Sequence, residues 1–425
     1  MFWIKLKAGA LQLTLFIAIV IAVLLTAFIL LVHTHKKFNI QTDFIIETTE
    51  NAHKGINYSL TNTILLNDTI AINLEDEDYK SLKVQREFWG VFEKVISISK
   101  IKSNTLKKVA LAGGVQPKQD RVALYLQDNN KPLVLVKDTK IKGFAYLPKQ
   151  GVKPGTISGE FYYGSKLIYG TSRIAQNLPK FLTESNTQFT VTKNAFSRAN
   201  EEQFLNIEAN KMYKNSFYEP TKFMFSNSEI YLNNASIIGN IIIQSKTKIV
   251  VDPTAVLKDV ILIAPEIEIQ NNVKGNFQAI ASKNIVIGER VELSYPSALV
   301  LNKNESAQTI QNGNIIKHNG IIVNNNSTIK GMIVYVSASE KNNFKTQLEL
   351  KEKATLIGEV YCNQNLELKG TVHGSVFTNN FVANQSGSVY QNHIYNGTIE
   401  VNKLPQEYVG LILENSNKGI AKWLY

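Results

Sequence analysis

Few side chains in this sequence could do chemistry, and the single cysteine and one acidic run stand out among them. Cys362 is the only cysteine, so it can form neither an intrachain disulfide nor a cysteine-based zinc site. It stands between Tyr361 and Asn363 in an apolar segment, which predicts a buried thiol rather than a nucleophile. The acidic run at residues 75–78 lacks the alternating spacing of a calcium loop, so we expect a solvated turn.

Acid–base catalysis would need carboxylates or histidines that converge on one place. The C-terminal half of the chain contains five candidates, Asp252, Asp259, His318, His373 and His393. Whether any of them meet depends on the elements that position them.

Those elements repeat. Short apolar runs recur every 18 residues at 249–251, 267–269 and 285–287, and again at 348–350 and 366–368. The run at 321–323 lies two periods after 285–287. A second series in the same phase lies at 237–239, 255–257, 273–275 and 291–293. An 18-residue period with three short strands predicts a three-sided parallel β-helix over residues 229–400. The polar stretches at 295–320 and 336–347 are expected to be loops that leave a corner of a coil.

This period brings no catalytic pair together. Asp252 is expected beside Gln270 and Asp259 beside Phe277, and the three histidines align with no carboxylate. No phosphate-binding glycine loop, nucleophile elbow or zinc-binding His-Glu-x-x-His motif occurs. We therefore expect no catalytic residue, no cofactor and no metal site, although a carbohydrate-active β-helix enzyme remains an alternative.

The N-terminus carries an uncharged stretch from Leu11 to Val32. As a helix it would be about 33 Å long, enough to cross a bilayer. It is too long for a cleaved secretory signal, and no Ala-x-Ala site follows it. Apolar spacing then continues an amphipathic helix to about residue 60, with Gly55 as its only breaker. We predict a basic leader at 1–9 and one helix within 10–63.

The leader ends in Lys5-Leu6-Lys7-Ala8-Gly9, followed by Ala10-Leu11-Gln12-Leu13-Thr14. A short basic leader, a glycine and an uncharged helix resemble the N-termini of type IV pilins and pseudopilins. The resemblance implies that a prepilin peptidase cuts between Gly9 and Ala10. Ala10 replaces the usual bulky residue, and Thr14 replaces the usual glutamate, which some minor pseudopilins also lack. A plain signal anchor remains the alternative.

The middle of the chain is expected to be a β region at 64–140 that packs as an antiparallel sheet against the helix. Its strands include 122–126 and 133–136, paired through a turn at 128–132. Gly143 and Gly159 repeat an apolar-x-Gly-x-aromatic pattern that returns at Gly358 and Gly374. This pattern predicts first coils and an irregular insertion at 141–228, including a helix at 197–214.

The repeat region resembles the bactofilins, bacterial cytoskeletal proteins whose polymer-forming domain is a small β-helix that stacks through bare ends. In this chain a tail at 401–425, which ends in Trp423-Leu424-Tyr425, is expected to cap the last coil. A rod with both ends covered would not stack freely.

The net charge of +11 comes from scattered lysines. Nucleic-acid binding usually shows a basic stripe with aromatic or arginine partners, and the sequence has none, so we expect no nucleic-acid partner. A lysine-rich solvated surface and a weak attraction for anionic membrane or wall polymers both remain open.

Together these features predict a mainly β, single-pass, non-catalytic structural protein of the bacterial inner membrane with an extracytoplasmic β-helix. Its partners would be the lipid bilayer and other envelope proteins, such as components of a type IV pilus or a type II secretion-like apparatus. A membrane-tethered bactofilin-like scaffold in the cytoplasm is the alternative.

Overall fold

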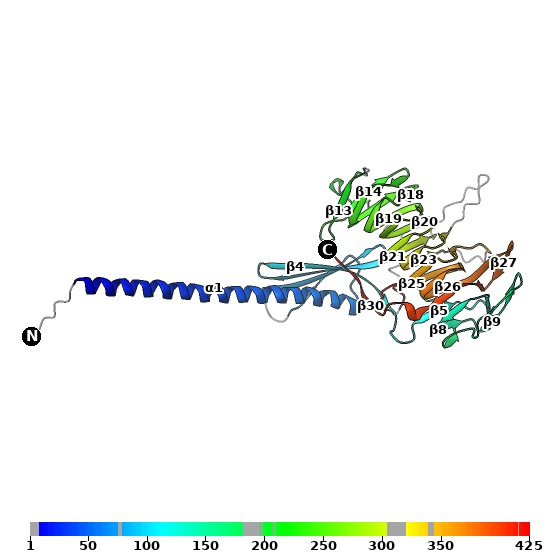
Figure 1. Ribbon diagram of the computed structural model, residues 1–425, viewed down its shortest axis with the longest axis horizontal. Coiled ribbons are helices and arrows are strands. Elements are labelled where there is room, and N and C mark those ends of the chain that lie inside the picture. The colour runs from blue at the N-terminus through cyan, green and yellow to red at the C-terminus, as the bar shows by residue number, and fades with distance from the viewer. Residues whose placement is uncertain are drawn as a thin grey trace, which may run out of the picture.

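The chain folds into a long helix, an antiparallel sheet beside its second half, and a column of coils that runs across the end of the helix (Figure 1). The computed structural model describes residues 8–74, 79–181, 196, 199–206, 208, 210–303, 320–338, 344–414 and 416–425. The acidic run at 75–78 and His318 lie outside these ranges. The mainly β fold predicted from the sequence is confirmed.

Helix α1 is continuous from Ala8–Thr61, as the sequence predicts. Its first half is exposed along its whole length. Its second half buries Thr48, Ala52, Ile56 and Ser59, which stand three or four residues apart and share one face. The helix therefore has a bare apolar half and a half that packs on the rest of the protein.

That packed half lies on a five-stranded antiparallel sheet. The sheet has the order β1-β2-β3-β4-β30, with strands at Thr69–Ile72, Lys80–Trp89, Phe92–Ile101, Asn104–Val115 and Asn417–Leu424. Ile56 and Ile64 pack with Val84, Val95 and Ala110 in a small apolar core between helix and sheet. The strand from the C-terminal end, β30, therefore completes the sheet that supports the N-terminal helix.

The remaining strands build a parallel β-helix whose three faces point their apolar side chains into one core. Its central strands are β13 (Met212–Asn215), β14 (Lys222–Ser226), β15 (Ile230–Leu232), β16 (Ser236–Gly239), β17 (Ile241–Ser245), β18 (Lys248–Val251), β19 (Val256–Ile269), β20 (Lys274–Ile287), β21 (Glu292–Asn302), β22 (Ile321–Val323), β23 (Thr328–Val336), β24 (Leu348–Leu350), β25 (Thr355–Leu368), β26 (Thr371–Gln385), β27 (Ser388–Gln391), β28 (His393–Tyr395) and β29 (Thr398–Glu400). Each buried Ile, Val or Leu contributes about 1.5–3 kcal/mol, and every coil supplies several.

The first series of apolar runs is confirmed as one face of the β-helix. Ile249 pairs with Ile267, and Ile267 with Ile285. Ile285 then pairs directly with Ile321, so the 36-residue step is a single coil that carries a long insertion at one corner. The next step, to Leu348, is also a direct pairing and spans 27 residues, as expected for a second insertion.

The second series is confirmed only in part. Leu257 pairs with Gly275 and Gly275 with Leu293, at the predicted step of 18. Ile237, however, pairs with Leu257, a step of 20, so Gly239 does not belong where the constant period placed it. The corner after β18 is longer, because residues 252–255 form a turn in which Ala255 N–H donates to the Asp252 carbonyl.

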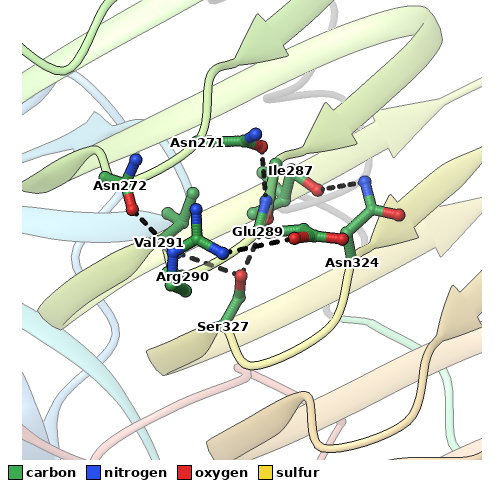
Figure 2. A network of polar contacts seen from close by, with 9 residues as sticks. Asn271, Asn272, Ile287, Glu289, Arg290, Val291, Asn324 and Ser327 are labelled. Carbon is green, nitrogen blue, oxygen red and sulfur yellow. Dashed lines mark hydrogen bonds and ion pairs between the residues drawn. The ribbon is translucent and has the colours of Figure 1, made fainter.

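Glycine and left-handed residues form columns along the β-helix. Gly331, Gly358 and Gly374 stack with φ of 142°, 149° and 155°, and a Cβ on Gly358 would lie 1.7 Å from the Gly331 carbonyl oxygen. Asn272 and Asn326 adopt φ of 64° and 60° at another corner, which confirms the predicted role of asparagine there. Figure 2 shows the polar contacts that join successive turns at this corner.

The order of coils in space differs from the order in the sequence. The last central strand, β26, pairs through Val376 with Leu124 of β5 (Val122–Leu126), and β29 pairs through Thr398 with Lys140 of β7 (Lys140–Lys142). β6 (Leu133–Val136) pairs in parallel with β28. One composite coil therefore takes β29 from near the C-terminal end of the chain and β5 and β6 from its N-terminal half.

The predicted antiparallel pairing of 122–126 with 133–136 is wrong. Both segments are parallel strands on different faces of the β-helix, because the turn between them is a corner rather than a hairpin. The corner is held by Asn392 Nδ2, which donates to the carbonyls of Lys131 and Pro132 at 3.0 Å.

The coil signal around Gly143 is real but lies at the opposite end of the rod from the one expected. β7, β8 (Phe144–Leu147), β9 (Val152–Pro154) and β12 (Ser172–Ile174) continue the column beyond the composite coil. Gly159 does not stack with these glycines, because it forms the turn of a hairpin between β10 (Thr156–Ile157) and β11 (Glu160–Phe161). The outer strand β12 is exposed.

Two further expectations are wrong. The segment 197–214 is not a helix in its described residues, which form a 3₁₀ turn at Glu201–Gln203 and strand β13. A neighbouring coil offers it backbone partners, as when Leu205 N–H donates to Phe223 O at 2.8 Å. The C-terminal tail does not cap the last coil, because β30 pairs with the open edge of β4. β5, β6 and β7 cover that coil instead.

Candidate membrane anchor and its attachment to the β-helix

The apolar half of α1 has the properties of a membrane-spanning segment. Among the described residues, α1 is the one helix long and apolar enough to cross a bilayer. Its large apolar side chains between residues 11 and 32 remain 39% to 69% exposed, so nothing in the chain covers them. The hydroxyls of Thr14 and Thr26 donate to the carbonyls of Leu11 and Ala22 in the same helix, at 2.9 and 2.8 Å. The segment therefore presents satisfied polar groups and an apolar surface, as a bilayer requires.

The structure places the predicted cleavage residues Gly9 and Ala10 at the exposed beginning of α1. A Cβ on Gly9 would meet no atom within 4 Å. Cleavage between these residues stays a prediction. Thr14, at the position where pilins usually have a glutamate, directs its hydroxyl to its own helix.

Gly55 is where α1 lies closest to the sheet, rather than a break in the helix. A Cβ at this position would lie 2.2 Å from Ser97 Oγ on β3 and 2.9 Å from Val84 Cγ2 on β2. Only a residue without a side chain allows this approach. Periodicity alone marked Gly55 as unfavourable, and only the facing strands show its use.

Charged and aromatic contacts fix the helix on both sides of that approach. Glu47 forms an ion pair with Lys80 of β2 at 2.5 Å. The ring of His53 stacks on Trp423 of β30, with centroids 5.3 Å apart. Trp423 is therefore part of the anchor's support, although the sequence gave no sign that the tail would reach the helix.

A buried ion-pair cluster joins three strands of the sheet to the end of α1. Arg86 Nη2 lies 2.6 Å from Glu93 Oε1, and Arg86 Nη1 donates to the Ile64 carbonyl at 2.7 Å. Lys418 of β30 lies 2.9 Å from the same carboxylate. Because Arg86 and Glu93 are almost fully buried, loss of either partner would leave an uncompensated charge, which typically costs about 3–5 kcal/mol.

The sheet in turn docks on the outer side of the β-helix through a second apolar core. This core joins Trp89, Phe92 and Leu111 of the sheet to Ile261 and Val300 of the β-helix, among others. The crossing segments of the chain also contribute to it, through residues such as Phe181 and Leu411. The anchor, sheet and β-helix are therefore connected by continuous packing rather than by a linker.

Gln278 of β20 makes the most specific polar contact of this interface. Its side-chain amide accepts from Val91 N–H at 2.8 Å and donates to the Trp89 carbonyl at 3.0 Å. The turn between β2 and β3 is thereby held against the β-helix. Gly90 in this turn has φ of 61°, and a Cβ there would lie 2.0 Å from Gln278 Oε1.

Glu359 of β25 lies where the two chain crossings meet the β-helix. Its carboxylate accepts from Gln116 Nε2 at 2.6 Å and from Leu411 N–H at 2.7 Å. Burial raises the pKa of Glu359 to about 7 despite these donors. The group is a structural junction between the segment after β4 and the segment before β30.

The residues that sequence analysis considered for catalysis are scattered. Asp252 accepts from the Tyr231 hydroxyl at 2.9 Å, and Asp259 occupies a bulge with φ of 60° where it binds Lys422. Cys362 is fully buried, as predicted, and burial raises the pKa of its thiol to about 12. His393 Nδ1 lies 2.6 Å from the Gln391 carbonyl.

One expectation about these residues is wrong. His373 Nδ1 lies 3.8 Å from Glu400 Oε2, although the constant period aligned no histidine with a carboxylate. The hairpin of β26 and β27 lengthens this coil and shifts the register. Lys403 and Lys142 already bind Glu400 and lower its pKa to about 2. Within the described part of the chain, no group of three or more His, Cys, Asp or Glu side chains could hold a metal ion.

Comparisons with known proteins add little to this geometry. No protein-family model matches the chain, and no curated protein matches it in sequence. Among solved structures, the crystal structure of the competence-associated pilin ComZ from Thermus thermophilus is similar at 7% identity. The match covers 90% of this chain and 97% of that chain, with a TM-score of 0.24. This score does not establish a shared fold.

Gly55 offers a test of how α1 is seated. We expect Gly55→Ala to lower the free energy of unfolding by about 1 kcal/mol or more, because the methyl group would force helix and strands apart. Intrinsic helix propensity alone favours alanine by about 1 kcal/mol, so the sign of the change is informative. Thermal unfolding in detergent, followed by tryptophan fluorescence, measures it. Asn57→Ala, at an exposed position of the same turn, is the control, and a more stable Gly55→Ala protein would contradict the close approach.

Proposed function

We propose that this chain is a membrane-anchored, non-catalytic structural protein that displays its β-helix outside the cytoplasm. We further propose that it acts as a minor-pilin-like component of a type IV pilus or type II secretion-like apparatus in the bacterial inner membrane. Its partners are then the bilayer and other envelope proteins of that apparatus.

The division of α1 carries this proposal. The first half of the helix is apolar and bare, while the second half packs on an antiparallel sheet without any break at the boundary. A helix that only anchored the protein could end at the membrane surface. Here about 22 Å of helix, residues 33–47, separates the apolar segment from the first fully buried position, Thr48. This arrangement suits a helix that packs among other helices in the membrane while it holds a folded head outside.

The N-terminus of the mature protein tests the pilin-like part of the proposal. We expect mass spectrometry of the protein purified from its native membrane to find Ala10 as the first residue. Gly9→Leu should block the processing, because the predicted cleavage follows a glycine. An intact Met1 in the native protein would contradict the pilin-like assignment and leave a plain signal anchor.

A cytoplasmic scaffold is a second candidate, because strand β12 at the outer end of the column is exposed and Ile174 within it is 65% exposed. Such an edge could accept another coil. The two candidates differ in which side of the membrane holds the β-helix. We expect alkaline phosphatase fused after Tyr425 to be active, since this enzyme requires an extracytoplasmic location. An inactive phosphatase, together with a fluorescent cytoplasmic reporter at the same position, would favour the scaffold.

A further inference from the structure

A groove of about 790 Å³ follows the outer surface of the β-helix beside strand β30. Its walls come from successive coils, namely from β19, β20, β21 and β23, so it runs along the column rather than along a strand. Five cationic side chains and one carboxylate line it: Lys258, Lys274, Arg290, Lys330, Lys422 and Glu292. The scattered lysines of the sequence are therefore gathered here by the coil geometry.

Not all of this charge is neutralised within the protein. Lys422 binds Asp259, and Lys274 lies 3.1 Å from Glu292 in a pair whose side chains are both more than 60% exposed. Exposed pairs of this kind are weak. Lys258 and Lys330 have no ion-pair partner among the residues that the structure describes.

Arg290 is held in place at one wall of the groove (Figure 2). Its Nε donates to Asn272 Oδ1 at 2.8 Å, and its Nη1 lies 3.3 Å from Glu289 Oε2. Its backbone has φ of 55°, and its N–H donates to the Asn325 carbonyl at 3.3 Å. The guanidinium is thus oriented before any ligand arrives, which lowers the entropy cost of binding an anion.

Amide and hydroxyl groups lie between the cations. Asn276 pairs in register with Lys258, and Ser294, Asn326 and Thr328 also line the groove. Lys258 and Lys330 are three coil steps apart, which corresponds to about 14 Å at the usual spacing of neighbouring strands. A ligand that meets both lysines must therefore be extended and must lie along the column.

We propose that this groove binds a linear anionic polysaccharide, with carboxylates of its sugar units on Lys258 and Lys330 and sugar hydroxyls on the polar groups between them. A single-stranded nucleic acid fits less well because it usually stacks its bases on exposed aromatic rings. The only aromatic side chain of the lining is Tyr295, whose hydroxyl donates to the Val409 carbonyl at 2.8 Å and whose ring packs beside Tyr408.

An anionic membrane surface also fits less well. If the apolar segment of α1 lies in a bilayer, the part of the helix between it and the sheet keeps the head about 20 Å away. The field of a charged membrane falls off within about 8 Å at physiological ionic strength. The column of coils lies beyond the sheet-covered half of the helix (Figure 1), so the groove is out of reach of its own membrane.

Binding of defined oligosaccharides to the full-length protein in lipid nanodiscs tests the proposal. The probe is an oligogalacturonate of about ten units, and neutral dextran of similar length is the ligand control. We expect saturable binding of the uronate that weakens as salt increases, and no binding of dextran. Lys258→Gln combined with Lys330→Gln should weaken uronate binding at least tenfold.

The matched protein control is Lys246→Gln combined with Lys283→Gln, which removes the same charge from exposed lysines outside the groove lining. We expect this control to bind the uronate within twofold of the unchanged protein. Equal losses in the two double variants would overturn the proposal in favour of unspecific charge attraction. A DNA fragment of equal charge that binds more tightly and responds to the groove variant alone would overturn it in favour of a nucleic-acid site. The result is independent of membrane topology and of N-terminal processing.

Discussion

The whole molecule depends on one pairing constraint, namely that each coil of the β-helix must find backbone partners on the coil before and the coil after it. At the end of the central column these partners come from a distant part of the sequence. Val376 pairs with Leu124, and Thr398 pairs with Lys140, roughly 250 residues apart in the chain. The composite coil can form only when both halves of the chain are present, so the β-helix is not a separable C-terminal domain. Such long-range closure is expected to make folding slow.

The same constraint explains how the membrane helix is connected to the β-helix. The chain enters the composite coil from β4 and leaves it toward β30, and these two strands pair with each other in the sheet that supports α1. Gln278 and Glu359 then fix the sheet and the two crossings on the outer side of the coils. A force on the helix would therefore reach the β-helix through packed strands. For a protein proposed to serve in an envelope apparatus, this is a mechanical coupling that a flexible linker could not supply.

The sequence predicts the coils well but not their order. Apolar periodicity reports which residues face a core, and it correctly identified the column from Ile249 to Leu366 and the long anchor helix. It contains no information on which coil stacks on which, so the place of β5 to β9 and the course of the tail were missed. A constant period also fails where a corner changes length, which hid the approach of His373 to Glu400. The groove escaped detection because its lysines are separated in sequence and meet only across coils.

Disulfide formation across the composite coil tests the central claim most directly. Lys140 and Thr398 are register partners on adjacent strands, whose Cα atoms lie about 4.8 Å apart, within the range that a disulfide can bridge. With Cys362 replaced by alanine, we expect cysteines at 140 and 398 to cross-link rapidly and almost completely under mild oxidation in the native membrane. Cysteines at 140 and 236 should stay reduced, because Ser236 belongs to the coils at the other end of the column. Cross-linking of 140 to 236 but not to 398 would show that the coils stack in sequence order and would contradict the composite coil.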